Sequence, residues 1–314
     1  MLDIIGIIFP VFAAIIVGYG FVWRGLFNQA DLRVLGKFVL NIAIPALMFQ
    51  AVATNRLSEA LRVDWMAFYA LAGILSMSAA YGLFTVMKSE PSRRAVAMMG
   101  TSCPNSGYIA YPILLLSFPA VAAKAFAMAV IVENFFIIPI ALVFGELSKA
   151  KGERSFFAIM GPILLNVMKR PMIIGLLLGV LVAGSGLPLP SPMLRLMTMF
   201  SSATAALALF VIGGSLFGLP MRGNVNAAFL TAIGKTLVHP LAALLVMTIA
   251  FSFGIDGMGT ELRAALLIIC ASPMMGIYTI LAQDYGHEGM ASISMLCATI
   301  GSFFVFSGLL FVLL

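Results

Sequence analysis

The chain has 314 residues, of which 62% are hydrophobic and only 10% are charged. Soluble proteins contain about 45–50% apolar and about 25% charged residues, so a soluble globular protein is excluded. The net charge of +6 comes from basic residues that are scattered singly or in pairs, without the basic, aromatic-rich face that binds nucleic acid.

The apolar residues suffice for ten membrane helices of about 20 residues each. What remains leaves no stretch of about 50 residues or more for a soluble domain such as an ATPase. The N-terminus carries Asp3 instead of the positive region of a signal peptide, so the first span should be retained. Predicted spans lie near residues 4–23, 34–54, 65–87, 95–116, 121–145, 171–188, 195–219, 228–253, 264–283 and 290–314.

The basic residues predict the orientation of these spans. Alternate loops place 13 of the 18 Lys and Arg residues on one side, five of them in the connector at 146–170. The positive-inside rule then puts this connector in the cytoplasm and both termini outside the cell's inner (plasma) membrane. Within the connector, the apolar stretch from Phe156 to Met168 is expected to lie along the membrane surface.

An internal repeat divides the spans into two sets of five. Span four contains Arg94-Ala95, eight residues and then Pro104-x-x-Gly107, and span nine contains the same pattern 169 residues later, ending in Pro273-x-x-Gly276. Because five is an odd number, the two halves must be inverted relative to each other. The sequence therefore predicts an all-α membrane protein of two inverted five-helix repeats, 1–150 and 151–314.

The two prolines lie at matching places inside predicted spans. Paired interruptions in inverted halves indicate a transporter whose site lies at the bilayer midplane, where the broken helices 4 and 9 cross. Ordinary proline kinks are the alternative. If the helices restart near Asn105 and Met274, their N-termini offer free N–H groups to an anion. No cationic side chain is expected near the middle of a span, because Lys235 lies within reach of the cytoplasmic surface.

The segment from Asn105 to Pro112 reads N-S-G-Y-I-A-Y-P and resembles the N-x-G-[FY]-x-G-x-P signature of the auxin efflux carrier family. That family includes the plant PIN proteins and bacterial malonate and malate permeases. Ile44-Pro45-Ala46-Leu47 resembles the family's second-span element, and the run from Ala282 to Ser302 resembles its ending. Ala110 departs from the usual Gly, and Met274 leaves no second Asn opposite Asn105.

The resemblance covers essentially the whole chain. It implies a scaffold of spans 1, 2, 6 and 7, and a moving transport unit of spans 3 to 5 and 8 to 10. It also implies a homodimer that forms through the scaffolds.

Polar residues at the two breaks are the candidates for substrate binding. The Asn105 amide should bind a carboxylate, or else only cap the restarted helix. Ser102, Ser106 and Tyr108 either contact substrate or bond to backbone. The full set of substrate-binding candidates is Asn41, Ser102, Asn105, Ser106, Gly107, Tyr108, Met274, Met275 and Gly276.

Glu133 is the acidic residue that the topology places at mid-bilayer. A carboxyl group there is expected to take up a proton or to hold a cation, although a satisfied structural hydrogen bond is the alternative. Asn134 beside it matches a polar pair of the family's plant members, and the 169-residue offset pairs Glu133 with Ser302. We therefore expect Glu133, Asn134 and Ser302 to couple transport to H⁺ or Na⁺.

Three further features have competing interpretations. Asn41 either lines the scaffold wall or bonds to backbone freed by Pro45, and His239 is either structural or a proton relay. Gly175-x3-Gly179 fits close helix packing. The three cysteines, Cys103, Cys270 and Cys297, lie in apolar segments and are expected to be buried hydrophobes, without a metal or a disulfide.

The sequence thus predicts a secondary carrier for a small organic anion, such as malonate or malate, without a cofactor. The alternative is a sodium- or proton-coupled symporter of the bile-acid/sodium type. An enzyme is disfavoured because the chain has no H-E-x-x-H, G-x-S-x-G or phosphate-binding loop motif. A channel would need rings of charge or a carbonyl filter, and neither is evident.

Overall fold

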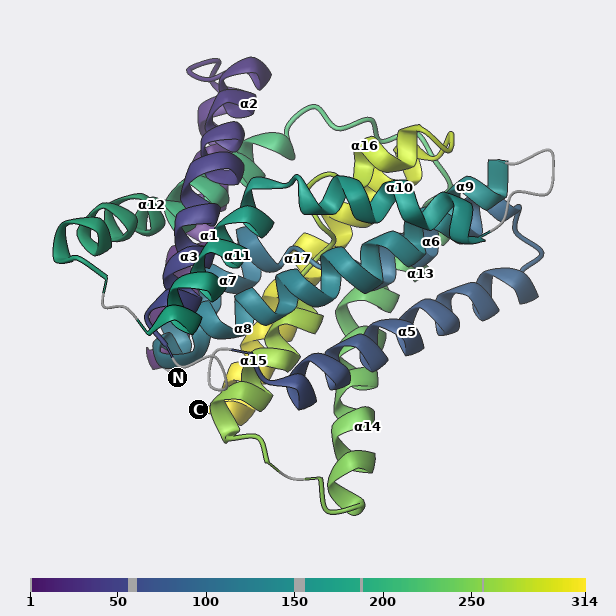
Figure 1. Ribbon diagram of the computed structural model, residues 1–314. Helices are drawn as coiled ribbons and strands as arrows, with labels where there is room; N and C mark the ends of the chain where they lie inside the picture. Colours follow the sequence, from purple (N-terminus) through teal and green to yellow (C-terminus); the bar gives the residue numbers. More distant parts are fainter. Residues whose placement is uncertain (1, 56–60, 150–155, 187–188, 256) are drawn as a thin grey trace. The chain divides into compact units, whose positions relative to one another are not determined.

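A computed structural model describes residues 2–55, 61–149, 156–186, 189–255 and 257–314, and these are helical without a β-strand (Figure 1). The α-helices are α1 (Leu2–Trp23), α2 (Gln29–Phe38), α3 (Ile44–Ala53), α5 (Val63–Val86), α6 (Pro91–Ser102), α7 (Tyr111–Ser117), α8 (Pro119–Val132), α9 (Ile138–Lys149), α10 (Phe156–Met168), α11 (Pro171–Ser185), α12 (Ser191–Ser215), α13 (Val225–Ile233), α14 (His239–Ser252), α15 (Thr260–Ala271), α16 (Tyr278–Gln283) and α17 (Glu288–Leu313). Four π-helices join them: η1 (Val39–Ala43), η2 (Ser106–Ala110), η3 (Glu133–Ile137) and η4 (Gly234–Val238).

Seven helices in the described ranges are long and apolar enough to cross a membrane, and an eighth is added if α10 and α11, bent by 67°, form one span. These helices confirm a multi-pass, all-helical membrane protein. The seven correspond to predicted spans 1, 2, 3, 5, 7, 8 and 10. Predicted spans 4 and 9 do not form continuous helices, because α6 and α15 each end after 12 residues.

Each π-helix in the described chain ends two residues before a proline, namely Pro45, Pro112, Pro139 or Pro240. Proline lacks the N–H group that bonds to the carbonyl four residues earlier, and its ring clashes with that carbonyl. A π-helical turn relieves the clash by shifting the bonds to a spacing of five residues. The prolines therefore explain where the long helices widen.

The helices cluster into two compact units, and each unit takes segments from both halves of the chain. Unit 1 contains residues 1–63, 107–131 and 166–218. Within it α11 packs on α3, where a side chain at Gly175 would collide with the backbone of Pro45 and one at Gly179 with the backbone of Phe49. The Gly175-x3-Gly179 pattern thus allows the two helices to approach closely, as expected.

Unit 2 contains residues 64–106, 132–165 and 219–314. One of its hydrophobic clusters packs small side chains of α13, among them Ala227 and Ala228, against Phe84, Met290 and Ile293. Cys103 and Cys270 are also buried in this unit, and Cys297 is partly buried. The prediction that the cysteines are buried hydrophobes is therefore confirmed for the first two.

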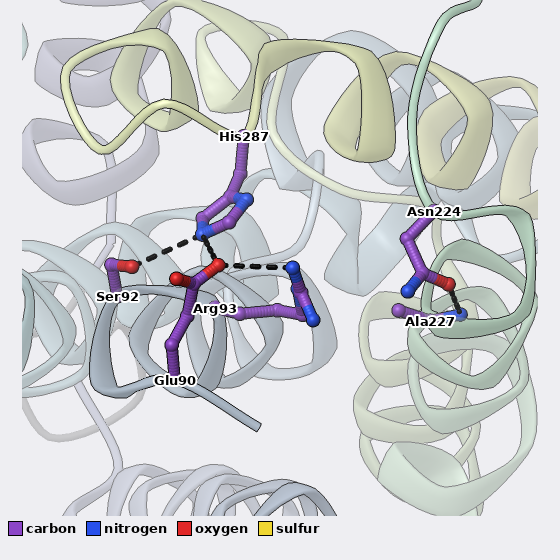
Figure 2. Close-up of polar contacts among 6 residues, drawn as sticks. All are labelled: Glu90, Ser92, Arg93, Asn224, Ala227 and His287. Atoms are coloured by element: carbon purple, nitrogen blue, oxygen red, sulfur yellow. Dashed lines mark hydrogen bonds and ion pairs between the residues drawn. The ribbon is translucent and has the colours of Figure 1, made fainter.

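The loop before α17 is tied to the start of α6 in unit 2. His287 Nε2 lies 3.1 Å from Ser92 Oγ and 3.2 Å from Glu90 Oε1, and Figure 2 shows these two contacts. The same Glu90 oxygen accepts a 2.9 Å hydrogen bond from Arg93 Nη2. Burial lowers the pKa of His287, and Arg93 lowers it further, whereas Glu90 raises it.

Candidate functional site

The first break follows α6. Proline cannot continue a helix, and the residue before it is pushed towards extended backbone angles. Accordingly α6 ends at Ser102, and Cys103 has φ −97° and ψ 96°. Helical structure resumes at Ser106 as η2. The residues from Cys103 to Asn105 are buried and not helical, although Cys103 N–H still closes the last turn of α6 by bonding to the Met99 carbonyl.

The second break follows α15 for the same reason. Helix α15 ends at Ala271, and Ser272, which precedes Pro273, has φ −65° and ψ 150°. The next helix, α16, begins only at Tyr278. The predicted restart near Met274 is therefore wrong by four residues, because the segment before Tyr278 pairs with the first break instead of coiling.

The two breaks cross within unit 2 and bond to each other. Asn105 N–H donates a 2.7 Å hydrogen bond to the Pro273 carbonyl, and Met275 N–H donates a 3.0 Å bond to the Cys103 carbonyl. Pro104 and Met274 form the antiparallel bridge between these bonds. We call this paired backbone, residues 103–105 and 273–275, the crossing.

The crossing corrects one expectation. The N–H groups at the breaks were expected to be free for an anion, but those of Asn105 and Met275 are used between the two segments. Buried backbone groups need partners, and in a membrane no water supplies them. An anion at this place would have to bind other donors, such as the side-chain amide of Asn105, which is 5% exposed.

Glu133 lies in η3 and receives two hydrogen bonds. Tyr69 Oη on α5 donates to Oε1 at 2.7 Å, and Ser106 Oγ, directly after the crossing, donates to Oε2 at 2.8 Å. All three side chains are buried. We call Tyr69, Ser106 and Glu133 the carboxylate cluster. It joins a predicted substrate residue, Ser106, to a predicted coupling residue.

Lys235, in η4, forms a second buried polar group. Its Nζ lies 2.7 Å from His239 Nδ1 and donates a 2.7 Å bond to the Cys270 carbonyl. The side chain is 0% exposed. The expectation that Lys235 reaches the cytoplasmic surface is therefore wrong, because the end of α15 offers a carbonyl that the ammonium group satisfies. We call Lys235, His239 and the Cys270 carbonyl the lysine cluster.

The two clusters are neighbours. The rings of Tyr69 and His239 stack with 6.2 Å between their centroids and 16° between their planes. Tyr69 therefore links the two clusters, because it donates to Glu133 and stacks on His239, whose Nδ1 lies 2.7 Å from Lys235 Nζ. Unit 2 therefore holds a buried acid and a buried base beside the two ends of the crossing.

Most of the other predicted site residues bond locally. Ser102 and Ser302 donate to carbonyls of their own helices at 2.7 and 2.8 Å, and Asn41 donates to the Lys37 carbonyl at 2.7 Å. Asn134 is buried at 3% exposure, beside Glu133. Gly107 lies in unit 1, where a side chain would collide with Phe126.

The remaining predicted residues differ in burial. Met274 and Met275 are buried, whereas Tyr108 and Gly276 are partly exposed. Of the coupling set, Glu133 contacts Ser106, but Ser302 bonds to the Thr299 carbonyl.

Sequence reasoning missed Tyr69 and the buried position of Lys235. One signal for Lys235 was available: it stands five residues before Pro240, and Glu133 stands six residues before Pro139. A charged residue shortly before a proline in mid-span falls inside a π-helix, a feature frequent at functional sites. Tyr69 has no such signal, because a tyrosine is unremarkable in an apolar helix. Across the described residues no group of His, Cys, Asp and Glu side chains is arranged to hold a metal ion.

Comparison with known proteins places this arrangement in a family. Residues 3–310 match the family described as "Membrane transport protein". The chain belongs to this family, the auxin efflux carrier family. The resemblance seen in the signature after Pro104 and in the second span is thereby confirmed over nearly the whole length. A family of transporters also agrees with the expectation that the chain is not an enzyme.

Two relatives with transporter names match this chain over different shares of its length. A protein of Rhizobium meliloti (strain 1021) named "Putative malonate transporter" is 24% identical over 317 residues, covering 100% of this chain and 97% of that protein. The protein named "Uncharacterized transporter YfdV" of Escherichia coli (strain K12) is 23% identical over 248 residues, covering 77% of each chain.

Proposed function

We propose that this protein is a secondary carrier that moves a small organic anion, a carboxylate of the malonate or malate kind, by alternating access. The observation that carries the proposal is the crossing, where two interrupted helices exchange backbone hydrogen bonds. Non-helical backbone at membrane depth is tolerated where it is buried in protein or lines a cavity, and in transporters such breaks form the substrate site.

The proposal includes the finer architecture. We propose that α6 with η2 and α7 forms one interrupted span and that α15 with α16 forms its inverted counterpart, giving ten spans in two repeats. The termini would face outward, the connector at 146–170 would be cytoplasmic, and spans 1, 2, 6 and 7 would act as the scaffold of a homodimer. The relative named for malonate supports a carboxylate substrate, although its identity to this chain is 24%.

Uptake of labelled carboxylates into proteoliposomes tests the substrate class. Purified protein is reconstituted, and internal malonate or malate is exchanged for the labelled anion outside. We expect exchange that saturates with anion concentration and is competed by unlabelled dicarboxylate. Exchange no faster than in protein-free liposomes for mono- and dicarboxylates alike would contradict the proposal.

Glu133 is proposed as the residue that couples transport to a proton. Its two oxygens already accept hydrogen bonds from Tyr69 and Ser106, so protonation would change contacts next to the crossing. Glu133→Gln keeps the shape and imitates the protonated group. We expect this variant to exchange anions with a rate that no longer depends on pH. Glu146→Gln, a change at a carboxylate on α9 that is 40% exposed, serves as the control and should retain the dependence.

A further inference from the structure

Lys235 requires an explanation that the proposed anion site does not supply. Its side chain is 0% exposed, and a buried ammonium carries a desolvation cost of several kcal/mol unless its three donors find partners. Two partners are present, the Cys270 carbonyl and His239 Nδ1, each at 2.7 Å. A well-packed apolar side chain would fill the same space at a lower cost. The charge itself is therefore the feature to explain.

The ammonium sits at the C-terminal end of a broken helix. The last four carbonyls of a helix lack partners and carry a partial negative charge. In α15 the carbonyls of Ile268 and Ile269 accept bonds from Ser272 N–H, and the Cys270 carbonyl accepts from Lys235. In transporters such half-helix ends are where coupling cations such as Na⁺ are coordinated.

The matching carbonyl at the first break has a neutral partner. Thr101, 169 residues before Cys270, accepts a 3.1 Å bond from Ser76 Oγ on α5. The positive charge is thus confined to the second break, and Glu133 is linked to it through Tyr69, which donates to Glu133 and stacks on His239 beside Lys235. A carbonyl, a carboxylate and the hydroxyl groups around it are oxygen ligands of the kind that hard cations prefer.

We propose that the Lys235 ammonium occupies the place of a coupling alkali cation, so that the protein carries its own cation and needs no sodium ion. Removing the side chain would then open a site for Na⁺ between the Cys270 carbonyl and Glu133. The statement that transport needs no sodium ion rests on the proposed carrier function. The existence of the cation site does not depend on that function. Under this proposal, the sodium-coupled alternative would require a cation that the lysine already replaces.

Thermal unfolding in detergent tests the site without any organic anion. Wild type, Lys235→Ser and Lys235→Arg are compared in sodium chloride and in choline chloride at equal ionic strength. We expect Tm of Lys235→Ser to rise by about 3 °C or more in sodium, saturating with concentration, because a ligand bound only by the folded state stabilises it. Wild type and Lys235→Arg should show no difference between the two salts. A folded Lys235→Ser protein that does not distinguish sodium from choline overturns the proposal.

A double variant keeps the test decisive if Lys235→Ser does not fold. Glu133→Gln combined with Lys235→Ser removes both charges, so it should fold and should not respond to sodium. A sodium response in this double variant or in wild type overturns the proposal, as does failure of the double variant to fold. These measurements contain no organic anion, so the lack of a sodium response would not argue against the proposed carrier function. Conversely, if the protein did not exchange carboxylates, a sodium response of Lys235→Ser would still support the proposed cation site.

Discussion

The two helix breaks share a backbone plan and differ in charge. At the first, the Thr101 carbonyl near the end of α6 accepts a hydrogen bond from the Ser76 hydroxyl group, and helical structure resumes at Ser106. At the second, the Cys270 carbonyl near the end of α15 accepts a hydrogen bond from the Lys235 ammonium group, and the next helix starts only at Tyr278. The two breaks thus share the backbone arrangement, while the charged group is found at only one of them.

The difference teaches which groups can vary between two helix breaks that cross in a membrane protein. Backbone groups at both breaks must be satisfied because the bilayer offers no water, so both breaks contribute backbone groups to the crossing bonds. The group that caps each half-helix can be neutral or charged as long as it donates a hydrogen bond. At the charged break, Tyr69 and His239 link the lysine to the buried carboxyl group of Glu133.

Removing the charged cap should have the largest effect. Lys235→Met leaves two buried acceptors, the Cys270 carbonyl and His239 Nδ1, without their donor, and each buried group left unsatisfied costs about 1–3 kcal/mol. The free energy of unfolding, followed in sodium-free detergent buffer by Trp fluorescence, measures it. Lys37→Met, at an exposed position on α2, is the control and should stay within about 0.5 kcal/mol of wild type. Equal stabilities of the two variants would refute the charge asymmetry.

The second largest effect is expected on anion affinity, when the two side chains at matching positions of the crossing are changed. Asn105→Ala removes an amide that we expect to bind the anion, and losing a hydrogen bond to a charged group costs about 1.5–3 kcal/mol, or roughly 10- to 150-fold in Kd. Met274→Leu, the matched change at the second break, should alter Kd less than about threefold. Both are measured by calorimetric titration with malonate. An unchanged Kd for Asn105→Ala would contradict the assignment.

The neutral cap should matter less than the charged one. Ser76→Ala deletes the 3.1 Å bond to the Thr101 carbonyl, and an ordinary hydrogen bond contributes about 0.5–1.5 kcal/mol. Unfolding of this variant is compared with that of Ser78→Ala, whose hydroxyl is exposed on the same helix. If Ser76→Ala cost as much as Lys235→Met, capping at the two breaks would be equivalent, and the comparison drawn here would fail.

The smallest effect is expected on the pH dependence of stability, through His287 beside the start of α6. Burial lowers the pKa of His287, so the unfolded chain binds a proton more readily than the folded one. The contribution of the neutral His287 side chain to the free energy of unfolding should therefore be complete above the ordinary histidine pKa of about 6.5. It should decline as the pH falls below that value. His287→Gln should flatten this decline in unfolding curves recorded between neutral and mildly acid pH. A stability that rises on acidification in wild type would show that Glu90 dominates instead.

Several features of the molecule were predictable from the sequence because they depend on local chemistry. The apolar runs indicated a multi-pass helical protein, and Pro104 and Pro273 correctly indicated that α6 and α15 are interrupted, because proline ends a helix in any surroundings. The signature after Pro104 indicated the family. Glu133 was identified because an acidic residue in an apolar run is costly and therefore conspicuous.

Only the tertiary structure decided which groups meet. The pairing of Asn105 with Pro273 joins residues far apart in the chain and uses up N–H groups that local reasoning left free. Lys235 could have reached the membrane surface from its position in span eight, but the unsatisfied carbonyl of Cys270 holds it inside. Tyr69 became a partner of Glu133 only because α5 lies beside η3. Local composition determines where a helix breaks, whereas the partners of its buried polar groups depend on packing between distant segments.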